Sequence, residues 1–343
     1  MTLSPSMPPQ RTSQPILATD LPSTGPASYA FTFVCQKGTL EGLSLLLVAS
    51  LKRFLRCQHE LIAAVPCPSA KRGDLSPLTY RLLSEMGVRV EYFNNPISGD
   101  RKGDLLTNKI YCFQIPTEME KTVFLDSDLL CLRDFSGNRR FSAPFNAAPT
   151  FLATGRNWER VYKAVGLPLP SSSMSPLFSD DLQPPYFNSG FVAIDTQLSL
   201  DLFKTWLDCF NQINQSKAME DNLYFREQVS LALAVGKMGL RYDTLDENYN
   251  FWVKAHPLNE QKLPFFLHHT WPNPPIYHQP HLIELVRSLV SDYPAMKPLV
   301  VKTRWKYYLR PHWMTAINQR MFEQRPKLRK VLGKDLADAI IAV

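Results

Sequence analysis

The chain has 343 residues, a formal charge of +7, 45% hydrophobic residues and 20% charged residues, a composition typical of a soluble globular protein. Its longest strongly apolar run, residues 43–51, is far shorter than the ~20 residues of a membrane-spanning helix, so no transmembrane segment is predicted. The six cysteines form no C-x-x-C pair, which argues against a zinc site or a disulfide framework. A reducing compartment, the cytoplasm, is therefore expected.

Both ends of the chain differ in composition from its body. Residues 1–28 are rich in Pro, Ser and Thr and predict a disordered leader; a transit peptide is the weaker alternative, because Arg11 is the only basic residue there. Residues 297–343 hold eleven basic and three acidic side chains, a net charge of +8. We expect a main domain over residues 29–280 and a basic, helical C-terminal extension over residues 281–343.

Strand and helix patterns alternate in the first half of the body. Strands are predicted at residues 29–34, 61–65, 88–93 and 122–125, and helices between them at residues 39–55, 77–86 and 105–115. This rhythm predicts an α/β fold with a mostly parallel sheet and helices on both of its faces. In such sheets, ligands bind at the carboxyl ends of the strands.

The second half begins with a Pro/Ser-rich loop over residues 168–186, long enough to suggest a lid or a variable insertion. A strand starting in "YFNSGFVAIDT" follows, then helices at about residues 199–213 and 221–237.

Two carboxylates interrupt apolar sequence in "KTVFLDSDLLCLRDF", residues 121–135. Side chains two apart in an extended segment point the same way, so Asp126 and Asp128 would project together from the end of a strand. Two like charges at that distance cost energy unless a cation lies near them. A hard divalent metal ion would satisfy them, and a polar strand-end turn is the alternative.

Lys109 lies in an apolar helical pattern. Its neighbours three and four residues away are Leu105, Leu106, Cys112 and Phe113. Such a lysine either extends its amine to water or contacts an anion. If the helix packs beside the predicted metal site, a phosphate is the attractive partner.

These residues belong to a pattern that resembles a known family. The run "LLTNKIYCFQIPTEMEKTVFLDSDLLCL" is similar to the core of GT-A-fold (Rossmann-like) glycosyltransferases, particularly the retaining glycogenin and lipopolysaccharide galactosyltransferase group, which is family 8-like. There a T-x-K helix precedes a strand ending in D-x-D. "FNSGFVAID" resembles that family's F-N-S-G strand, and Glu227-Gln228 stands where Asp-Gln is usual. In order and spacing, the resemblance covers roughly residues 29–275.

The end of the pattern departs from the family. "FLHHTWPNP" stands at the place of a late H-x-x-G-x-x-K motif, whose histidine completes the metal site. If His268 is that histidine, Trp271 replaces the glycine and Pro274 the lysine; His269 is the other candidate. A phosphate contact would then come from elsewhere, from Lys37 or from a residue of the tail.

The resemblance implies a metal-dependent hexosyltransferase that moves sugar from a UDP-sugar to a glycan, protein or lipid-linked acceptor with retention of configuration. It implies Mn²⁺, or Mg²⁺, held by Asp126, Asp128 and His268. The nucleotide sugar would contact Lys109, Asp126, Ser127, Asn188, Ser189 and Gly190. Catalytic roles would fall to Gln228, Glu227 and Lys109.

Two other functions remain open at this stage. A nucleotidyltransferase that forms sugar nucleotides shares the architecture and the metal, although only "QKGT" is available as a phosphate loop. A non-catalytic sugar-nucleotide-binding protein is the second. Panels of nucleotide sugars would separate them.

The basic tail has two interpretations. Lys302, Lys306 and Arg310 recur every four residues, and Trp305 and Tyr308 share another helical face. Such a segment can bind an anionic membrane peripherally, or pack its aromatic face on the body and leave the basic face in solvent. No nucleic-acid partner is expected.

Overall fold

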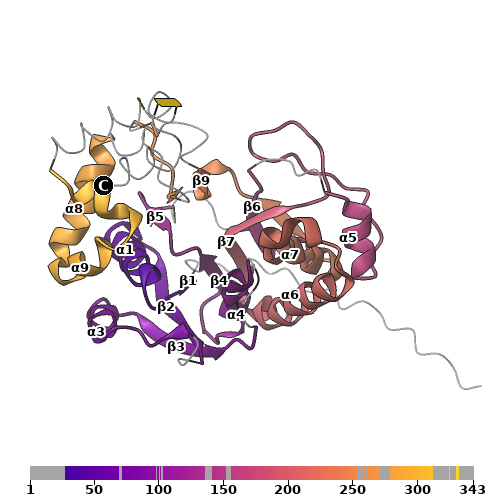
Figure 1. The fold of residues 1–343 in the computed structure, drawn as a ribbon, viewed down its shortest axis with the longest axis horizontal. Coiled ribbons are helices and arrows are strands. Elements are labelled where there is room, and N and C mark those ends of the chain that lie inside the picture. The colour runs from indigo at the N-terminus through magenta and orange to yellow at the C-terminus, as the bar shows by residue number, and fades with distance from the viewer. Residues whose placement is uncertain are drawn as a thin grey trace, which may run out of the picture.

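A computed structural model describes residues 28–68, 72–97, 99, 101, 103–135, 141–151, 156–252, 258–259, 261–269 and 279–311, with 324, 330 and 331. The predicted leader, Trp271 and Pro274 lie outside these residues, as does most of the chain beyond residue 311. The fold is α/β, as predicted, with one large sheet between two layers of helices (Figure 1).

The large sheet has seven strands in the order β3-β2-β1-β4-β7-β6-β8. Only β7 is antiparallel to its neighbours in this sheet. The strands are β1 (Ser28–Val34), β2 (Gln58–Cys67), β3 (Arg89–Asn94), β4 (Lys121–Leu125), β6 (Phe145–Pro149), β7 (Phe187–Asp195) and β8 (Tyr242–Thr244). The mostly parallel sheet predicted from the sequence is therefore confirmed.

The central strands are apolar because helices cover both faces of the sheet. In β1, Phe31 and Phe33 face one core, which they share with α1 (Thr39–Phe54), while Ala30 faces the other. The second core contains Trp206 of α6 (Thr196–Ser216), whose ring lies 5.6 Å from that of Phe113. In Figure 1, α1 and α3 (Pro77–Glu85) lie on one side of the sheet, and α5 (Trp158–Ala164), α6 and α7 (Arg226–Lys237) on the other.

Two predicted helices are interrupted. Residues 105–115 form three short pieces, η1 (Asp104–Thr107), α4 (Asn108–Tyr111) and η2 (Cys112–Gln114). The Thr107 hydroxyl donates to the Asp104 carbonyl and so competes with the backbone for that acceptor. The Asn95 side-chain amide donates to the side-chain oxygens of Thr107 and Asn108. Residues 220–237 divide into η3 (Glu220–Phe225) and α7, with non-helical backbone at Asn222.

A second, three-stranded sheet has the order β5-β10-β9. Its strands are β5 (Leu129–Cys131), β10 (Phe266–His268) and β9 (Phe251–Trp252). His268 at the end of β10 pairs with Leu129 on one side and with Trp252 on the other. The small sheet therefore brings the late histidine next to the carboxylate pair that follows β4.

The described part of the C-terminal extension packs along α1 (Figure 1). It consists of α8 (Pro280–Asp292), η6 (Pro294–Met296), α9 (Lys297–Val300) and η7 (Arg304–Leu309). A Cβ on Gly42 of α1 would lie 2.4 Å from the Leu299 carbonyl oxygen, so the two helices fit only because residue 42 is glycine.

The aromatic face of the extension is buried in the protein. Trp305 and Tyr308 are 1% and 0% exposed, which matches the interpretation of a segment packed on the body. These aromatic side chains are therefore not available to a lipid surface. In the part of the chain that the structure describes, no helix is long and apolar enough to cross a membrane.

Candidate active site

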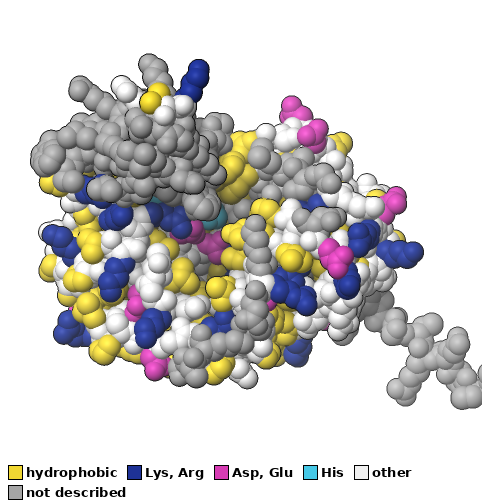
Figure 2. Space-filling model, viewed as in Figure 1, with side chains coloured by type: hydrophobic (Ala, Val, Ile, Leu, Met, Phe, Trp, Pro, Cys, Tyr) yellow, Lys and Arg dark blue, Asp and Glu magenta, His cyan; other side chains and the backbone are white. Residues whose placement is uncertain are grey.

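A cavity of about 1020 Å³ opens at the edge of the sheet where β1 and β4 end. Because β7 runs the opposite way, its first residues reach the same edge, and the Asp126 amide donates to the Gly190 carbonyl over 2.8 Å. Figure 2 shows a hollow in this face with acidic and His side chains at its floor. This central cavity is lined by Lys37, Lys109, Asp126, Asp128, His268 and Arg304, among others.

Asp126 and Asp128 face one point, although not in the extended geometry expected from the sequence. The backbone turns after Asp126, whose carbonyl accepts from the Leu129 amide over 3.0 Å. The Ser127 hydroxyl donates to the Val34 carbonyl over 2.5 Å, which ties the turn to β1. Nε2 of His268 lies 3.3 Å from Asp128 Oδ1 and 3.9 Å from Asp126 Oδ2.

The three side chains fit a divalent cation. Their ligand atoms all lie within 4.8 Å of one another and combine two carboxylates with one imidazole, a set that can hold a divalent metal ion. Nδ1 of His268 is 2.7 Å from Asn250 Oδ1, so Nε2 faces the carboxylates. The Asn250 amide also donates to Asn188 Oδ1 over 2.8 Å. This orienting role of Asn250 could not be predicted from the D-x-D pattern, because nothing in that pattern points to a neighbour so distant in the chain.

Gly190 permits this close approach. A Cβ at residue 190 would lie 2.8 Å from Cε1 of His268, 2.9 Å from Asn188 Oδ1 and 3.1 Å from Asp126 Oδ2. No side chain fits there without moving the histidine or the carboxylate. The glycine of "FNSG" is therefore required by space and not by an unusual backbone angle.

His269 faces away from the carboxylates. Its ring lies 4.4 Å from that of Trp305, and neither ring nitrogen has a hydrogen-bond partner among the described residues. Burial, together with the charge of Arg304, lowers the pKa of His269 to about 3, so the ring is neutral. Of the two candidate histidines, the geometry brings His268 to the carboxylate pair.

Lys109 is buried and paired within the protein. Its Nζ lies 2.9 Å from Asp126 Oδ1, 3.2 Å from the Ser189 hydroxyl and 3.8 Å from Glu227 Oε2. Burial alone would lower the pKa of Lys109, but Asp126 and Glu227 outweigh it and raise the pKa above its ordinary value. The anion that Lys109 contacts in this structure is thus a carboxylate, and its amine does not extend to solvent.

Glu227 lies behind Lys109 with one oxygen unpaired. Its Oε2 accepts from the Ser189 hydroxyl over 3.2 Å, whereas Oε1 is buried and has no partner in the described chain. Burial raises the pKa of Glu227 to about 7, against the opposing charge of Lys109. Oε1 of Gln228 accepts from the Ser189 amide over 3.5 Å. The structure thus brings the predicted residues of "FNSG", Glu227 and Gln228 to one wall of the central cavity.

The raised pKa of Glu227 makes stability depend on pH. The pKa of Glu227 in the folded protein, about 7, exceeds its ordinary value of 4.5. The contribution of this carboxyl group to the free energy of unfolding is therefore fully present below pH 4.5 and is lost as the pH rises through 7. We expect the unfolding free energy of Glu227→Gln relative to that of wild type to increase by up to about 3 kcal/mol between pH 4 and pH 8. Urea unfolding of both chelator-treated proteins across this pH range measures the difference. Glu220→Gln, at an exposed position, is the control, and parallel pH profiles for wild type and Glu227→Gln would contradict the expectation.

Arg304 lines the site, although the sequence predicted only an unspecified residue of the tail there. Its guanidinium lies 3.7 Å from Asp128 Oδ2 and donates to the His269 carbonyl. Burial opposes ionisation of Asp128, but His268 and Arg304 lower its pKa to about 2. The sequence analysis expected a missing phosphate contact to come from Lys37 or a tail residue, and both Lys37 and Arg304 line the central cavity.

An aromatic stack forms a second wall of the cavity. The rings of Phe151 and Trp252 are 4.7 Å apart and nearly parallel, and Phe151 also meets the edge of His268 at 6.0 Å. The Pro/Ser-rich loop is bonded to this wall, because the Leu177 and Phe178 amides donate to the Thr150 and Phe151 carbonyls over 2.9 and 3.0 Å. The loop therefore supports one side of the cavity.

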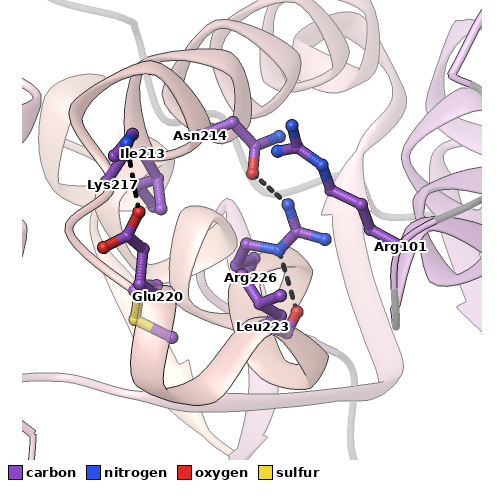
Figure 3. A pocket seen from close by; sticks show the side chains of 8 residues that line it. Arg101, Ile213, Asn214, Lys217, Glu220, Leu223 and Arg226 are labelled. Atoms are coloured by element: carbon purple, nitrogen blue, oxygen red, sulfur yellow. Dashed lines mark hydrogen bonds and ion pairs between the residues drawn. The ribbon is translucent and has the colours of Figure 1, made fainter.

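A smaller cavity of about 290 Å³ is lined by residues of η3 and of the end of α6, among them Leu223 and Asn214 (Figure 3). Arg226 lines it and is bonded to the Asn214 side chain, to the Leu223 carbonyl and, over 2.8 Å, to Asp104. Leu223 and Arg226 face this cavity, whereas Tyr224 and Phe225 line the central one. The Arg226–Asp104 pair thus supports the segment that carries part of the central wall.

Breaking this pair is expected to destabilise the protein. The side chains of Arg226 and Asp104 are 2% and 4% exposed, so Arg226→Met leaves a buried carboxylate and should cost about 3–5 kcal/mol of unfolding free energy. Urea unfolding would measure the loss. Arg81→Met, which removes an exposed pair with Glu85, should cost less than about 1 kcal/mol. Equal losses in the two variants would show that burial of the Arg226 pair is unimportant.

Comparison with known proteins identifies a family for this chain. The sequence matches a family described as Rhodobacterales glycosyltransferase domain over residues 31–239, more than half of the chain. No curated protein matches the chain. The matched segment contains Lys109, the carboxylate pair and Glu227, whereas His268 and Arg304 lie beyond its end.

Proposed function

Since the chain belongs to the Rhodobacterales glycosyltransferase domain family, we propose that it transfers a hexose, with the help of a divalent metal ion, from a UDP-sugar to an acceptor. The observation that carries this proposal is the convergence of Asp126, Asp128 and His268 on one point of the central cavity, beside the buried amine of Lys109. A family match alone does not supply the metal or the donor. The ligand atoms of these three side chains support the metal ion, and the metal ion together with Lys109 supports a donor that carries a diphosphate.

Mn²⁺ or Mg²⁺ held by Asp126, Asp128 and His268 would act as a Lewis acid and offset the charge of the departing diphosphate. The neighbouring residues keep this set in place. Asn250 orients His268, Gly190 leaves it room, and Ser127 anchors the turn that carries both carboxylates. A set positioned in advance requires little rearrangement during the reaction.

The donor sugar would bind against the wall that Lys109 and the first residues of β7 form together. The buried Oε1 of Glu227, which has no partner among the described residues, can accept a hydrogen bond from a sugar hydroxyl. Asn188, Ser189 and Gln228 would add short polar contacts along the same wall. Lys109 would hold a positive charge next to the position where the diphosphate separates from the sugar.

The reaction exchanges one bond for another at the anomeric carbon. The bond from C1 to the phosphate oxygen breaks, and its electron pair leaves with the diphosphate. The acceptor hydroxyl forms the new C1–O bond, and its proton passes to the departing diphosphate. We propose retention of configuration, with the acceptor attacking the face that the diphosphate leaves.

A glycan is the acceptor that the cavity supports best. The Phe151–Trp252 stack lies next to His268 and presents apolar rings at the reaction centre. The C–H face of a pyranose packs well on such rings, while its hydroxyls meet the polar side chains opposite. A glycan on a protein or on a lipid carrier would present the same sugar to this wall.

The test is incubation of the whole protein with a panel of nucleotide sugars and Mn²⁺, followed by mass spectrometry of the products. We expect release of a nucleoside diphosphate and transfer or hydrolysis of its sugar, both abolished by a chelator. The same panel in a thermal-shift assay should identify the donor, because a bound donor stabilises the folded state. Formation of a nucleotide sugar from a sugar phosphate and UTP, or no reaction and no donor binding, would refute the proposal.

A further inference from the structure

We propose that Arg304 couples metal binding to diphosphate binding: it exchanges its contact with Asp128 for the diphosphate when cation and donor bind. This inference rests on the proposed function and goes beyond it, since it assigns a role to a residue outside the matched family segment. Four observations support it: the position of Arg304, its loose pairing, the fixed backbone that carries it and the charge balance at Asp128.

The position of Arg304 suits a residue that changes partners. Its side chain is 23% exposed and lines the central cavity, 3.7 Å from Asp128 Oδ2. One guanidinium nitrogen donates to the His269 carbonyl. Within the described residues, the other guanidinium N–H groups have no hydrogen-bond partner, so they are available to a ligand in the cavity.

The base beside the other carboxylate is held differently. Lys109 is 7% exposed, lies 2.9 Å from Asp126 and also contacts Ser189, so it is fixed in place. The Arg304–Asp128 contact is longer and more exposed. Of the two bases that balance the carboxylate pair, Arg304 is therefore the one that can leave.

The backbone that carries Arg304 is anchored. The Thr303 hydroxyl accepts from the Trp305 amide over 3.0 Å at the start of η7, and the Trp305 ring is buried against His269. The preceding helix, α9, packs closely on Gly42. Movement is thus confined to the arginine side chain, which needs no rearrangement of the fold.

Charge balance connects the two ligands. A cation at Asp128 and the guanidinium of Arg304 would share one carboxylate and repel each other. A diphosphate removes this conflict, because its oxygens can bind the cation and the guanidinium together, and the planar guanidinium matches pairs of phosphate oxygens. The cation and the diphosphate should therefore each strengthen the binding of the other, with Arg304 as part of the cause.

The experiment measures binding and not turnover. Titration calorimetry gives the affinity of Mn²⁺ without nucleotide, and of UDP and UMP with Mn²⁺ present, for wild type, Arg304→Met and Arg304→Lys. Lys302→Met, an exposed residue two positions earlier, is the control. We expect Arg304→Met to bind Mn²⁺ alone about threefold more tightly and UDP about tenfold more weakly, with a smaller loss for UMP. Lys302→Met should match wild type.

The outcomes separate this inference from the proposed function. If wild type binds Mn²⁺ and UDP and all variants bind both equally well, Arg304 has no coupling role, although the transferase proposal stands. If wild type binds neither ligand, both fail. Should Arg304→Met not fold, Arg304→Lys still decides, because it keeps the charge and loses the planar fork: a larger loss for UDP than for UMP supports the inference, and equal affinities overturn it.

Discussion

Asp128→Asn is expected to lower metal-dependent turnover of the donor by about 100- to 1000-fold, the range seen when one preorganised electrostatic group is lost. The amide keeps the shape of the side chain but cannot supply the negative charge that a divalent cation requires. Asp128 lies 3.3 Å from His268 Nε2 and is the closer of the two carboxylates to that nitrogen, so its loss should weaken the cation site most. Initial rates of UDP release at saturating Mn²⁺ measure the effect.

Controls distinguish this loss from misfolding. Asp201→Asn changes an exposed aspartate on α6, 3.9 Å from Lys204, and should leave turnover at the wild-type level. Metal-free Asp128→Asn should still unfold cooperatively, although at a lower temperature than wild type because the contacts of the carboxylate with His268 and Arg304 are lost. The stabilisation by Mn²⁺ should be lost. Undiminished turnover in a folded Asp128→Asn protein would remove the metal mechanism.

Lys109→Met is expected to affect both stability and turnover. Its amine balances Asp126 and Glu227 in a nearly closed space, so removing it leaves two carboxylates without their shared cation. Breaking such a pair costs about 3–5 kcal/mol of unfolding free energy. Turnover should fall by about 100-fold or more, because a positive charge beside the departing diphosphate is lost.

A double variant separates the two effects of Lys109. Adding Glu227→Gln to Lys109→Met removes one uncompensated carboxylate and should recover part of the stability, but no turnover. Lys204→Met, an exposed lysine 3.9 Å from Asp201, is the control for loss of a surface charge. Urea unfolding and donor turnover would be measured on the same preparations. Recovery of turnover in the double variant would mean that Lys109 serves the fold alone.

The sequence predicted the strands of the site better than its helices. The strand before Asp126 and the one that begins with "FNSG" were located because buried strands form continuous apolar runs. The segment at residues 105–115 has the apolar spacing of a helix, yet it forms three short pieces, and Asn95, 12 residues or more away, bonds to the side chains of Thr107 and Asn108 within it. Spacing reports which face is buried and does not report contacts with distant side chains.

The residues of the candidate site also differ in how well the sequence predicts them. Lys109, Asp126, Asp128, Glu227 and His268 could be proposed because their types occur in an ordered pattern. Asn250 lies in "ENYNFW", which the sequence assigns to packing under the sugar pocket, and no pattern identifies Arg304 individually. Their roles depend on contacts made after folding: Asn250 orients His268, and Arg304 meets Asp128 from the C-terminal extension. Residues that act through another residue leave little trace in a single sequence.

The reversed direction of β7 means that different segments of the chain form the two walls of the cavity. The other strands of the large sheet run toward the cavity side and end there. In contrast, β7 begins at the cavity, directly after the loop at residues 168–186, and runs away from it. That loop is bonded to the aromatic wall through the Leu177 and Phe178 amides. Exchanging it between related proteins would therefore reshape the aromatic side of the cavity, where we propose that the acceptor binds, so that new pairings of donor and acceptor could arise by replacement of one segment.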